Sequence, residues 1–267
     1  AVFIGCTPIL SIDASTQNVY HFSDTDKNIS LLDISETFGT YDGSFVLYDN
    51  NLDSWKIYDL EEATKRIPPE STYKIYDALL GLESGIITPE HSSMTWNGDA
   101  FPFPSWEADQ DLNSAMQNSV NWYFQAIDSQ LGINRVQEFL NKIEYGNQTT
   151  SSNLDLYWSD FSLKISPLEQ VTLLKKFNTN EFHLNSQNVF SVKNAIKIAS
   201  TPNGNFYGKT GTGRVNGQDI NGWFIGYVET SDNSYYFATN IQSDSNATGK
   251  KAFEITSDIL KKLHIWN

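Results

Sequence analysis

The last quarter of the sequence contains a series of strand-like runs separated by turn signals. These runs cover residues 205–213, 221–228 and 234–241. The segments between them are Val215-Asn216-Gly217 and Ser231-Asp232-Asn233, which are typical of tight turns. Strands joined in this way pair with their neighbours in the chain, so we expect an antiparallel meander. An amphipathic pattern over residues 249–263 then predicts a helix.

A second strand-rich part lies far upstream. Residues 45–48 and 55–58 flank a turn at 49–51 and predict a hairpin. Helical patterns fill most of the sequence between the hairpin and the meander, over residues 71–86, 109–131, 134–143, 166–178 and 188–200. The order of strands, helices, strands and helix predicts an α+β fold in which the outer strands share one antiparallel sheet flanked by helices. We expect residues 1–267 to form a single domain, with residues 1–42 as its least certain part.

Charge and cysteine content exclude several classes of function. The 267 residues include 18 Lys and Arg and 32 Asp and Glu, a net charge of -14, and no basic stripe suited to nucleic acid is present. The single cysteine, Cys6, rules out a disulfide within the chain and a cysteine-based metal site. The four histidines are scattered, so we expect no metal site and no Ser-His-Asp triad. The apolar start, residues 1–6, reads either as a first strand or as the trimmed end of a membrane span or signal segment.

A nucleophile and a base are suggested by Ser71 and Lys74. Pro68 and Pro69 block a helix just upstream, and apolar residues recur at helical spacing downstream, which predicts a helix starting at Ser71. Residues three apart on a helix share one face. A serine hydroxyl needs a neighbouring base, and a desolvated lysine loses its proton readily. Taken alone, the pair could equally be a capping serine and a solvated lysine.

A run of lysine, threonine and glycine, residues 209–212, lies on the first strand of the meander. It is not a phosphate-binding loop, because the glycine spacing is wrong and a strand follows instead of a helix. On a strand, Lys209 and Gly211 would face one way and Thr210 and Thr212 the other. Such an edge can align an extended amide ligand, with Gly211 allowing close approach. A plain strand with a surface lysine is the alternative. The aromatic and proline-rich residues 89–104 could form a wall of the site or simply pack.

Read together, these motifs carry a family resemblance. Ser71-x-x-Lys74, Ser119-x-Asn121 and Lys209-Thr210-Gly211 occur in the order found in penicillin-binding proteins and serine β-lactamases. Tyr145-Gly146-Asn147 and Trp158 resemble class D β-lactamases, but those enzymes typically have valine where this chain has Asn121. With Asn121, residues 43–263 resemble the extracellular sensor domain of BlaR/MecR-type β-lactam receptors.

The resemblance implies a role for each motif residue. Ser71 would attack the lactam carbonyl, and Lys74, which in this family may be carboxylated by carbon dioxide, would take its proton. The backbone N–H groups of Ser71 and Thr212 would hold the oxyanion, and Ser119 would relay a proton to the lactam nitrogen. The remaining residues would contact the ligand or the base, namely Lys209, Thr210, Gly211, Tyr145, Asn147 and Trp158. No other cofactor is implied.

Function then depends on the fate of the acyl-enzyme. If Asn121 keeps Lys74 as an uncarboxylated amine, the ester persists and the chain is a β-lactam receptor without net turnover. The alternatives are a class D-like hydrolase and a cell-wall transpeptidase. As a receptor, the chain would be an ectodomain on the extracellular face of the bacterial membrane. Its partners would be β-lactams and the transmembrane and cytoplasmic parts of its own receptor.

Overall fold

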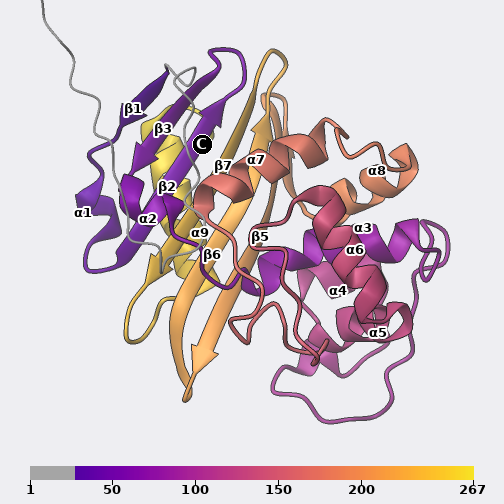
Figure 1. Ribbon diagram of the computed structural model, residues 1–267. Helices are drawn as coiled ribbons and strands as arrows, with labels where there is room; N and C mark the ends of the chain where they lie inside the picture. The colour runs from indigo at the N-terminus through magenta and orange to yellow at the C-terminus, as the bar shows by residue number, and fades with distance from the viewer. Residues whose placement is uncertain (1–27) are drawn as a thin grey trace, which may run out of the picture.

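One mixed sheet forms the centre of the computed structural model, which describes residues 28–267 (Figure 1). Within these residues the strand order is β1-β3-β2-β7-β6-β5-β4. β1 is parallel to β3, and every other neighbouring pair is antiparallel. The strands are β1 (Ile29–Leu31), β2 (Asp42–Asp49), β3 (Ser54–Tyr58), β4 (Lys197–Thr201), β5 (Gly204–Val215), β6 (Gln218–Glu229) and β7 (Ser234–Gln242).

The two ends of the described chain meet in this sheet. The predicted hairpin forms β2 and β3, and the predicted meander forms β5, β6 and β7. β2 then pairs with β7 over its full length, from Asp42 opposite Gln242 to Asp49 opposite Tyr235. The expectation of one sheet built from both outer parts of the chain is therefore confirmed.

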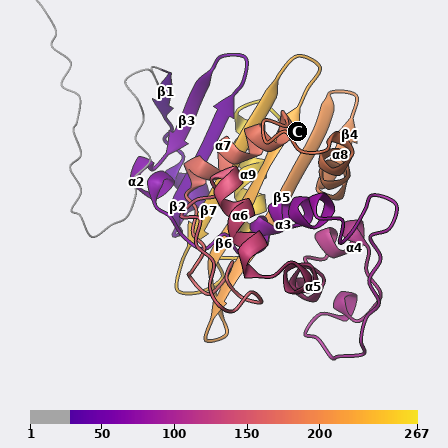
Figure 2. The ribbon, with the colours of Figure 1, turned by 45° about the vertical axis from the view of Figure 1, so that its right-hand side comes forward.

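Helices cover both faces of the sheet and pack beside it. They are α1 (Ser35–Phe38), α2 (Leu60–Thr64), α3 (Lys74–Glu83), α4 (Leu112–Gln117), α5 (Asn121–Leu131), α6 (Ile133–Ile143), α7 (Pro167–Asn178), α8 (Ser186–Ala195) and α9 (Gly249–Lys262), with 3-10 turns η1 (Glu70–Tyr73) and η2 (Pro104–Trp106). Figures 1 and 2 show α3, α4, α5 and α6 gathered on the β5 side of the sheet. No helix among residues 28–267 is both long and apolar enough to cross a membrane.

Strand alternation divides the hydrophobic core in two. Ile225 and Tyr227 of β6 join α7, α3 and α5 in the larger cluster. Phe224 and Val228 of the same strand join α9 in the smaller one. Because successive side chains of a strand point to opposite faces, α7 and α9 lie on opposite sides of the sheet.

Three sequence-based assignments need correction. The helix predicted to start at Ser71 begins as the 3-10 turn η1 and becomes α-helical only at Lys74. The helical region at 109–131 is split at residues 118–120 into α4 and α5. The helix predicted for 188–200 ends at Ala195, and residues 197–201 form β4 because they pair with β5. The prediction for Ala1–Cys6 lies outside the described residues.

Candidate active site

The turn that carries Ser71 is held in an unusual conformation. Glu70, directly before it, has a left-handed φ of 51°, and Glu70 N donates to the backbone oxygen of Trp158 at 3.0 Å. The hydroxyl of Thr72 donates to the oxygen of Pro69 at 2.6 Å. These contacts fix η1 on both sides of Ser71, and α3 begins immediately after it. Lys74 Nζ then lies 2.7 Å from Ser71 Oγ.

Lys74 is enclosed by apolar and amide groups. Its side chain is 1% exposed, and the rings of Phe124 and Trp158 each lie 5.7 Å from Nζ. Asn121, the first residue of α5, accepts a hydrogen bond from Nζ through Oδ1 at 2.7 Å. Burial first, and the charge of Lys209 second, hold the pKa of Lys74 well below its ordinary value. This lysine is therefore placed and tuned to accept the proton of Ser71.

A second lysine approaches from the sheet. Lys209 of β5 donates through Nζ to Ser119 Oγ at 3.0 Å and to the oxygen of Thr210 at 2.9 Å. Ser119 lies in the break between α4 and α5, where a left-handed φ of 55° ends one helix before the next begins. Burial lowers the pKa of Lys209 to about 7. The structure thus joins the second and third motifs in one hydrogen bond, which is suited to passing a proton through Ser119.

β5 packs directly on the turn that carries the nucleophile, with the part of the strand that extends past its short neighbour β4. A Cβ on Gly211 would lie 3.2 Å from Ser71 N, so only glycine allows this approach without displacement. Thr212 faces the other way, toward α9, and its Oγ1 accepts a hydrogen bond from Gly249 N at 2.8 Å. Thr210 faces the same way, with its Cβ beside Gly249. The predicted alternation along residues 209–212 is confirmed.

Two cavities open on either side of the nucleophile, with volumes of about 290 and 340 Å³. Ser71, Asn121 and Thr212 line both of them. Phe103 and Trp106 form an aromatic wall of one cavity, so part of the segment 89–104 does border the cleft. Trp158 and Phe161 line the other. A ligand carbonyl placed at Ser71 can therefore extend its substituents in two directions.

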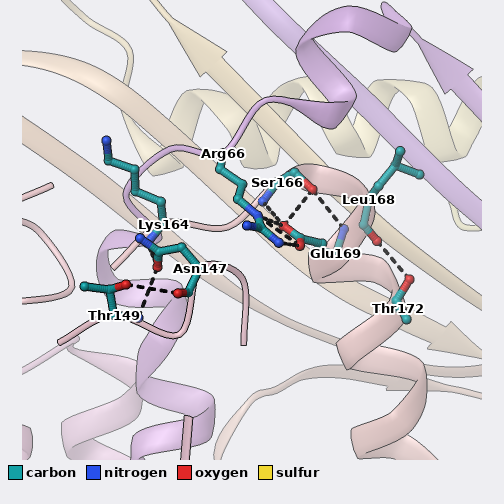
Figure 3. Close-up of polar contacts among 8 residues, drawn as sticks. All are labelled: Arg66, Asn147, Thr149, Lys164, Ser166, Leu168, Glu169 and Thr172. Carbon is teal, nitrogen blue, oxygen red and sulfur yellow. Dashed lines mark hydrogen bonds and ion pairs between the residues drawn. The ribbon is translucent and has the colours of Figure 1, made fainter. Parts of the chain in front are cut away.

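Two predicted ligand-binding residues lie elsewhere. Tyr145 is fully buried and packs edge-on against Tyr73 and Tyr76, with centroid distances of 5.2 Å to each. Asn147 is turned into its own loop, where its Oδ1 accepts a hydrogen bond from Lys164 N at 2.9 Å (Figure 3). Its Nδ2 donates to the backbone oxygen of Ser162 at 2.7 Å. Neither lines the cleft, because the turn at Gly146 brings this segment against residues 164–165. They are supports for the site rather than parts of the ligand surface.

The same loop is clamped at its far end. Ser166 and Glu169 form the predicted capping box at the start of α7. Glu169 also forms a two-pronged ion pair with Arg66, which Figure 3 shows beside Ser166. Ile67 and Ile165 form a β-bridge next to this ion pair. The loop that carries Trp158 is therefore tied at both ends to the core near Lys74.

Sequence reasoning missed a buried acidic group next to the nucleophile. Glu70 is 6% exposed and accepts a hydrogen bond from Asn221 Nδ2 at 3.2 Å. A Cβ on Gly213 would clash with Glu70 Oε1, so the carboxyl group occupies the space that this glycine leaves free. Burial raises the pKa of Glu70 to about 8, although Asn221 and Lys74 act in the opposite direction. Only its position directly before Ser71 could have signalled a role, since the burial comes from β5 and β6.

Comparison with known proteins places the chain in a family. Residues 35–261 match the penicillin-binding protein transpeptidase domain. The chain is 45% identical to Regulatory protein BlaR1 of Bacillus licheniformis over 262 residues, which are 97% of this chain and 43% of that protein. The chain thus spans less than half the length of this relative.

Solved structures agree with this assignment. The C-terminal domain of the Bacillus licheniformis BlaR penicillin-receptor superimposes with a TM-score of 0.87 at 46% identity, covering 90% of this chain and 98% of that domain. The class D β-lactamase BAT-2 superimposes with a TM-score of 0.83 at 36% identity, covering 88% of this chain and 97% of the enzyme. The chain therefore belongs to the penicillin-binding protein transpeptidase-domain family, on the branch that BlaR/MecR-type receptors share with class D β-lactamases.

Proposed function

We propose that this chain is the β-lactam-binding sensor of a BlaR/MecR-type receptor, acylated once at Ser71 and released from the ester only slowly. The observation that carries the proposal is the 2.7 Å hydrogen bond between Lys74 Nζ and Asn121 Oδ1. The receptor relatives support it, among them the BlaR penicillin-receptor domain at 46% identity.

Acylation uses the groups already in contact. Ser71 Oγ attacks the lactam carbonyl carbon while its proton passes to Lys74 Nζ, 2.7 Å away. The C–N bond of the ring breaks, and Ser119 passes its proton to the leaving nitrogen. Lys209 Nζ, hydrogen-bonded to Ser119 Oγ, replaces that proton and regains one from solvent. The backbone N–H groups of Ser71 and Thr212 hold the oxyanion across the narrow gap at Gly211. Lys209 supplies the positive charge for the carboxylate of the ligand, and Thr210 and Thr212 border the cavity beside Ser71.

Persistence of the ester follows from the position of Asn121. Hydrolysis needs a base that can activate water beside the ester. A carboxylated Lys74 would place an anionic oxygen close to Asn121 Oδ1, which is itself an acceptor, so the amide disfavours that state. The uncarboxylated lysine keeps the proton taken from Ser71 and shares it with the amide. No strong base then remains next to the ester.

The wider receptor is part of the proposal. The chain would lie on the extracellular face of a bacterial membrane and report acylation to transmembrane and cytoplasmic parts of the same protein. This context comes from the receptor relatives, of which the chain covers 43 to 46%.

A class D-like hydrolase is the second candidate. It is favoured by Trp158, whose ring lies 5.7 Å from Lys74 Nζ and completes the apolar enclosure that a carboxylated lysine would need. The 36% identity to BAT-2 points the same way.

Mass spectrometry after mixing with benzylpenicillin tests the assignment. We expect one adduct per chain, on Ser71, that lasts for hours. Ser71→Ala should give no adduct, whereas Ser257→Ala, on α9 across the sheet, should behave like the parent protein. Loss of the adduct within seconds with many turnovers would instead identify a hydrolase, and cross-linking of a D-Ala-D-Ala peptide a transpeptidase.

A further inference from the structure

Two buried carboxyl groups lie one helical turn beneath the catalytic lysine. Asp77 of α3 and Asp128 of α5 are both fully shielded from solvent. Asp77 follows Lys74 by three residues and Asp128 follows Asn121 by seven, so each lies on the same face of its helix as its predecessor. Lys74 and Asn121 are hydrogen-bonded across these two helices. The two aspartates therefore meet in the same seam, deeper in the protein.

The ionisation of each carboxyl group depends on the other. None of their oxygens has a donor with good geometry among the described residues, yet Asp77 and Asp128 are near enough to exchange a hydrogen bond. Two adjacent carboxylates without solvent cannot both be ionised, because like charges repel strongly in a medium of low polarity. A single proton held between them satisfies both groups. The hydroxyl of Tyr157 also lies within hydrogen-bonding reach of Asp128 and favours its ionised form, so we place the shared proton on Asp77.

Burial raises the pKa of both groups, that of Asp128 to about 7. The other titratable groups facing the pair are Tyr73 of η1, Tyr123 of α5, Asp155 and Tyr157 of the following loop, and Lys74 of α3. Lys74 is the cation of this set. It also faces Glu70 of η1 and Lys209 of β5.

We propose that Asp77 and Asp128 share one proton, retain one negative charge beneath Lys74, and so favour its ammonium form over both the neutral amine and the carbon dioxide adduct. Formation of that adduct joins the amine nitrogen to the carbon of CO₂ and releases a proton to water, leaving an anion on Lys74. A nearby negative charge opposes this anion and stabilises the ammonium ion. The pair is thus a positioning element that helps Lys74 to keep the proton of Ser71.

A set of asparagine variants measures the charge of the pair. In Asp77→Asn, the amide N–H can donate the hydrogen bond that protonated Asp77 would donate to Asp128. This variant therefore preserves the single negative charge on Asp128. The double variant Asp77→Asn with Asp128→Asn removes that charge. Asp258→Asn, an exposed change on α9, is the matched control for loss of one carboxylate at a distance.

Lys74 itself provides the readouts. With ¹³C-bicarbonate, the ratio of carbamate to free amine seen by NMR should rise about tenfold in the double variant and stay near the parent level in Asp77→Asn. The pH at which benzylpenicillin acylation reaches half its maximal rate should fall by about one unit in the double variant. An unchanged double variant would overturn the proposal, since the pair would then be neutral. A single variant as altered as the double would also overturn it, since both groups would then be ionised.

A second measurement does not depend on the double variant folding. The Cγ resonances of Asp77 and Asp128 in the parent protein should report one protonated and one ionised carboxyl group near pH 7.5. Two ionised or two neutral groups would contradict the shared proton. The proposal rests on the proposed function only in taking Lys74 as the proton acceptor, and these readouts are independent of adduct lifetime. A failure here is therefore distinguishable from a failure of the receptor assignment.

Discussion

In the proposed function, the amide of Asn121 is the group that makes the chain a receptor rather than a hydrolase. Its oxygen lies 2.7 Å from Lys74 Nζ, the same distance that separates Nζ from Ser71 Oγ. The lysine therefore has two hydrogen-bond partners with different roles. Ser71 gives its proton to Lys74 during acylation, and Asn121 then favours the protonated form of Lys74.

Replacing Asn121 with valine should shorten the life of the ester. Valine removes the acceptor that favours the protonated lysine, so Lys74 can act as a base or bind carbon dioxide. We expect deacylation of the benzylpenicillin adduct to accelerate by about 10²-fold, measured by mass spectrometry over time. Gln130→Val, an exposed change on the same helix, should have no effect. An unchanged ester lifetime would remove the role given to Asn121.

Removing the base itself should block the first step. Lys74→Ala leaves Ser71 with no group in contact that can accept its proton, so acylation should slow by about 10³-fold or more. Stopped-flow fluorescence with a chromogenic cephalosporin measures the rate. Lys142→Ala, exposed on α6, serves as control. A variant that acylates at the parental rate would show that another group deprotonates the serine.

At the scale of elements, the approach of β5 to η1 shapes the oxyanion pocket. Gly211 and Gly213 face η1, and Glu70 fills the space beside them. A side chain at Gly211 would press on η1 and move the strand away from Ser71.

Gly211→Ala should therefore slow acylation without unfolding the protein. The new Cβ would lie 3.1 Å from Glu70 Cβ and 3.2 Å from Pro69 O, so β5 must shift by a few tenths of an ångström. We expect the acylation rate to fall by about 10–100-fold, because oxyanion donors act only at short distance. The melting temperature and the rate, measured side by side, distinguish this from general loss of fold. Parental acylation would mean that the gap tolerates a methyl group.

Elements that depend on local sequence signals were predictable, and elements that depend on pairing with distant parts of the chain were not. Ser166, Pro167 and Glu169 are enough to predict the start of α7. Residues 197–201 become a strand only because β5 lies alongside. In the site, the motif spacing was enough to bring Ser71, Lys74, Ser119 and Lys209 together. Glu70, Asp77 and Asp128 could not be found in this way, because a carboxyl group becomes unusual only when tertiary packing buries it.

At the scale of the whole molecule, buried carboxyl groups should give the fold an unusual dependence on pH. Burial raises the pKa of Glu70 to about 8 and that of Asp128 to about 7. Between pH 5 and 7 these groups stay largely protonated in the folded chain, whereas they ionise in the unfolded chain. The folded state then binds more protons, so raising the pH favours unfolding. Buried Lys74 and Lys209, whose pKa values are lowered, act in the opposite direction, Lys209 only above about pH 7.

We expect the free energy of unfolding to fall by roughly 2–4 kcal/mol between pH 5 and pH 7. Urea titrations at several pH values measure this slope. Glu70→Gln should remove about a third of it, because glutamine does not titrate and Asp77 and Asp128 supply the rest. Glu107→Gln, in the loop after η2, should leave it unchanged. Stability that rises over this interval would show that the carboxyl groups are ionised in the folded protein.

The active site draws Ser71, Asn121 and Lys209 from segments separated by up to 138 positions along the chain. They come together because β5 packs on η1 and α5 packs on α3. Under the proposed function, covalent labelling by a fluorescent penicillin therefore counts the correctly folded molecules in a sample. Spectroscopy of the same mixture reports only an average over folded and unfolded molecules.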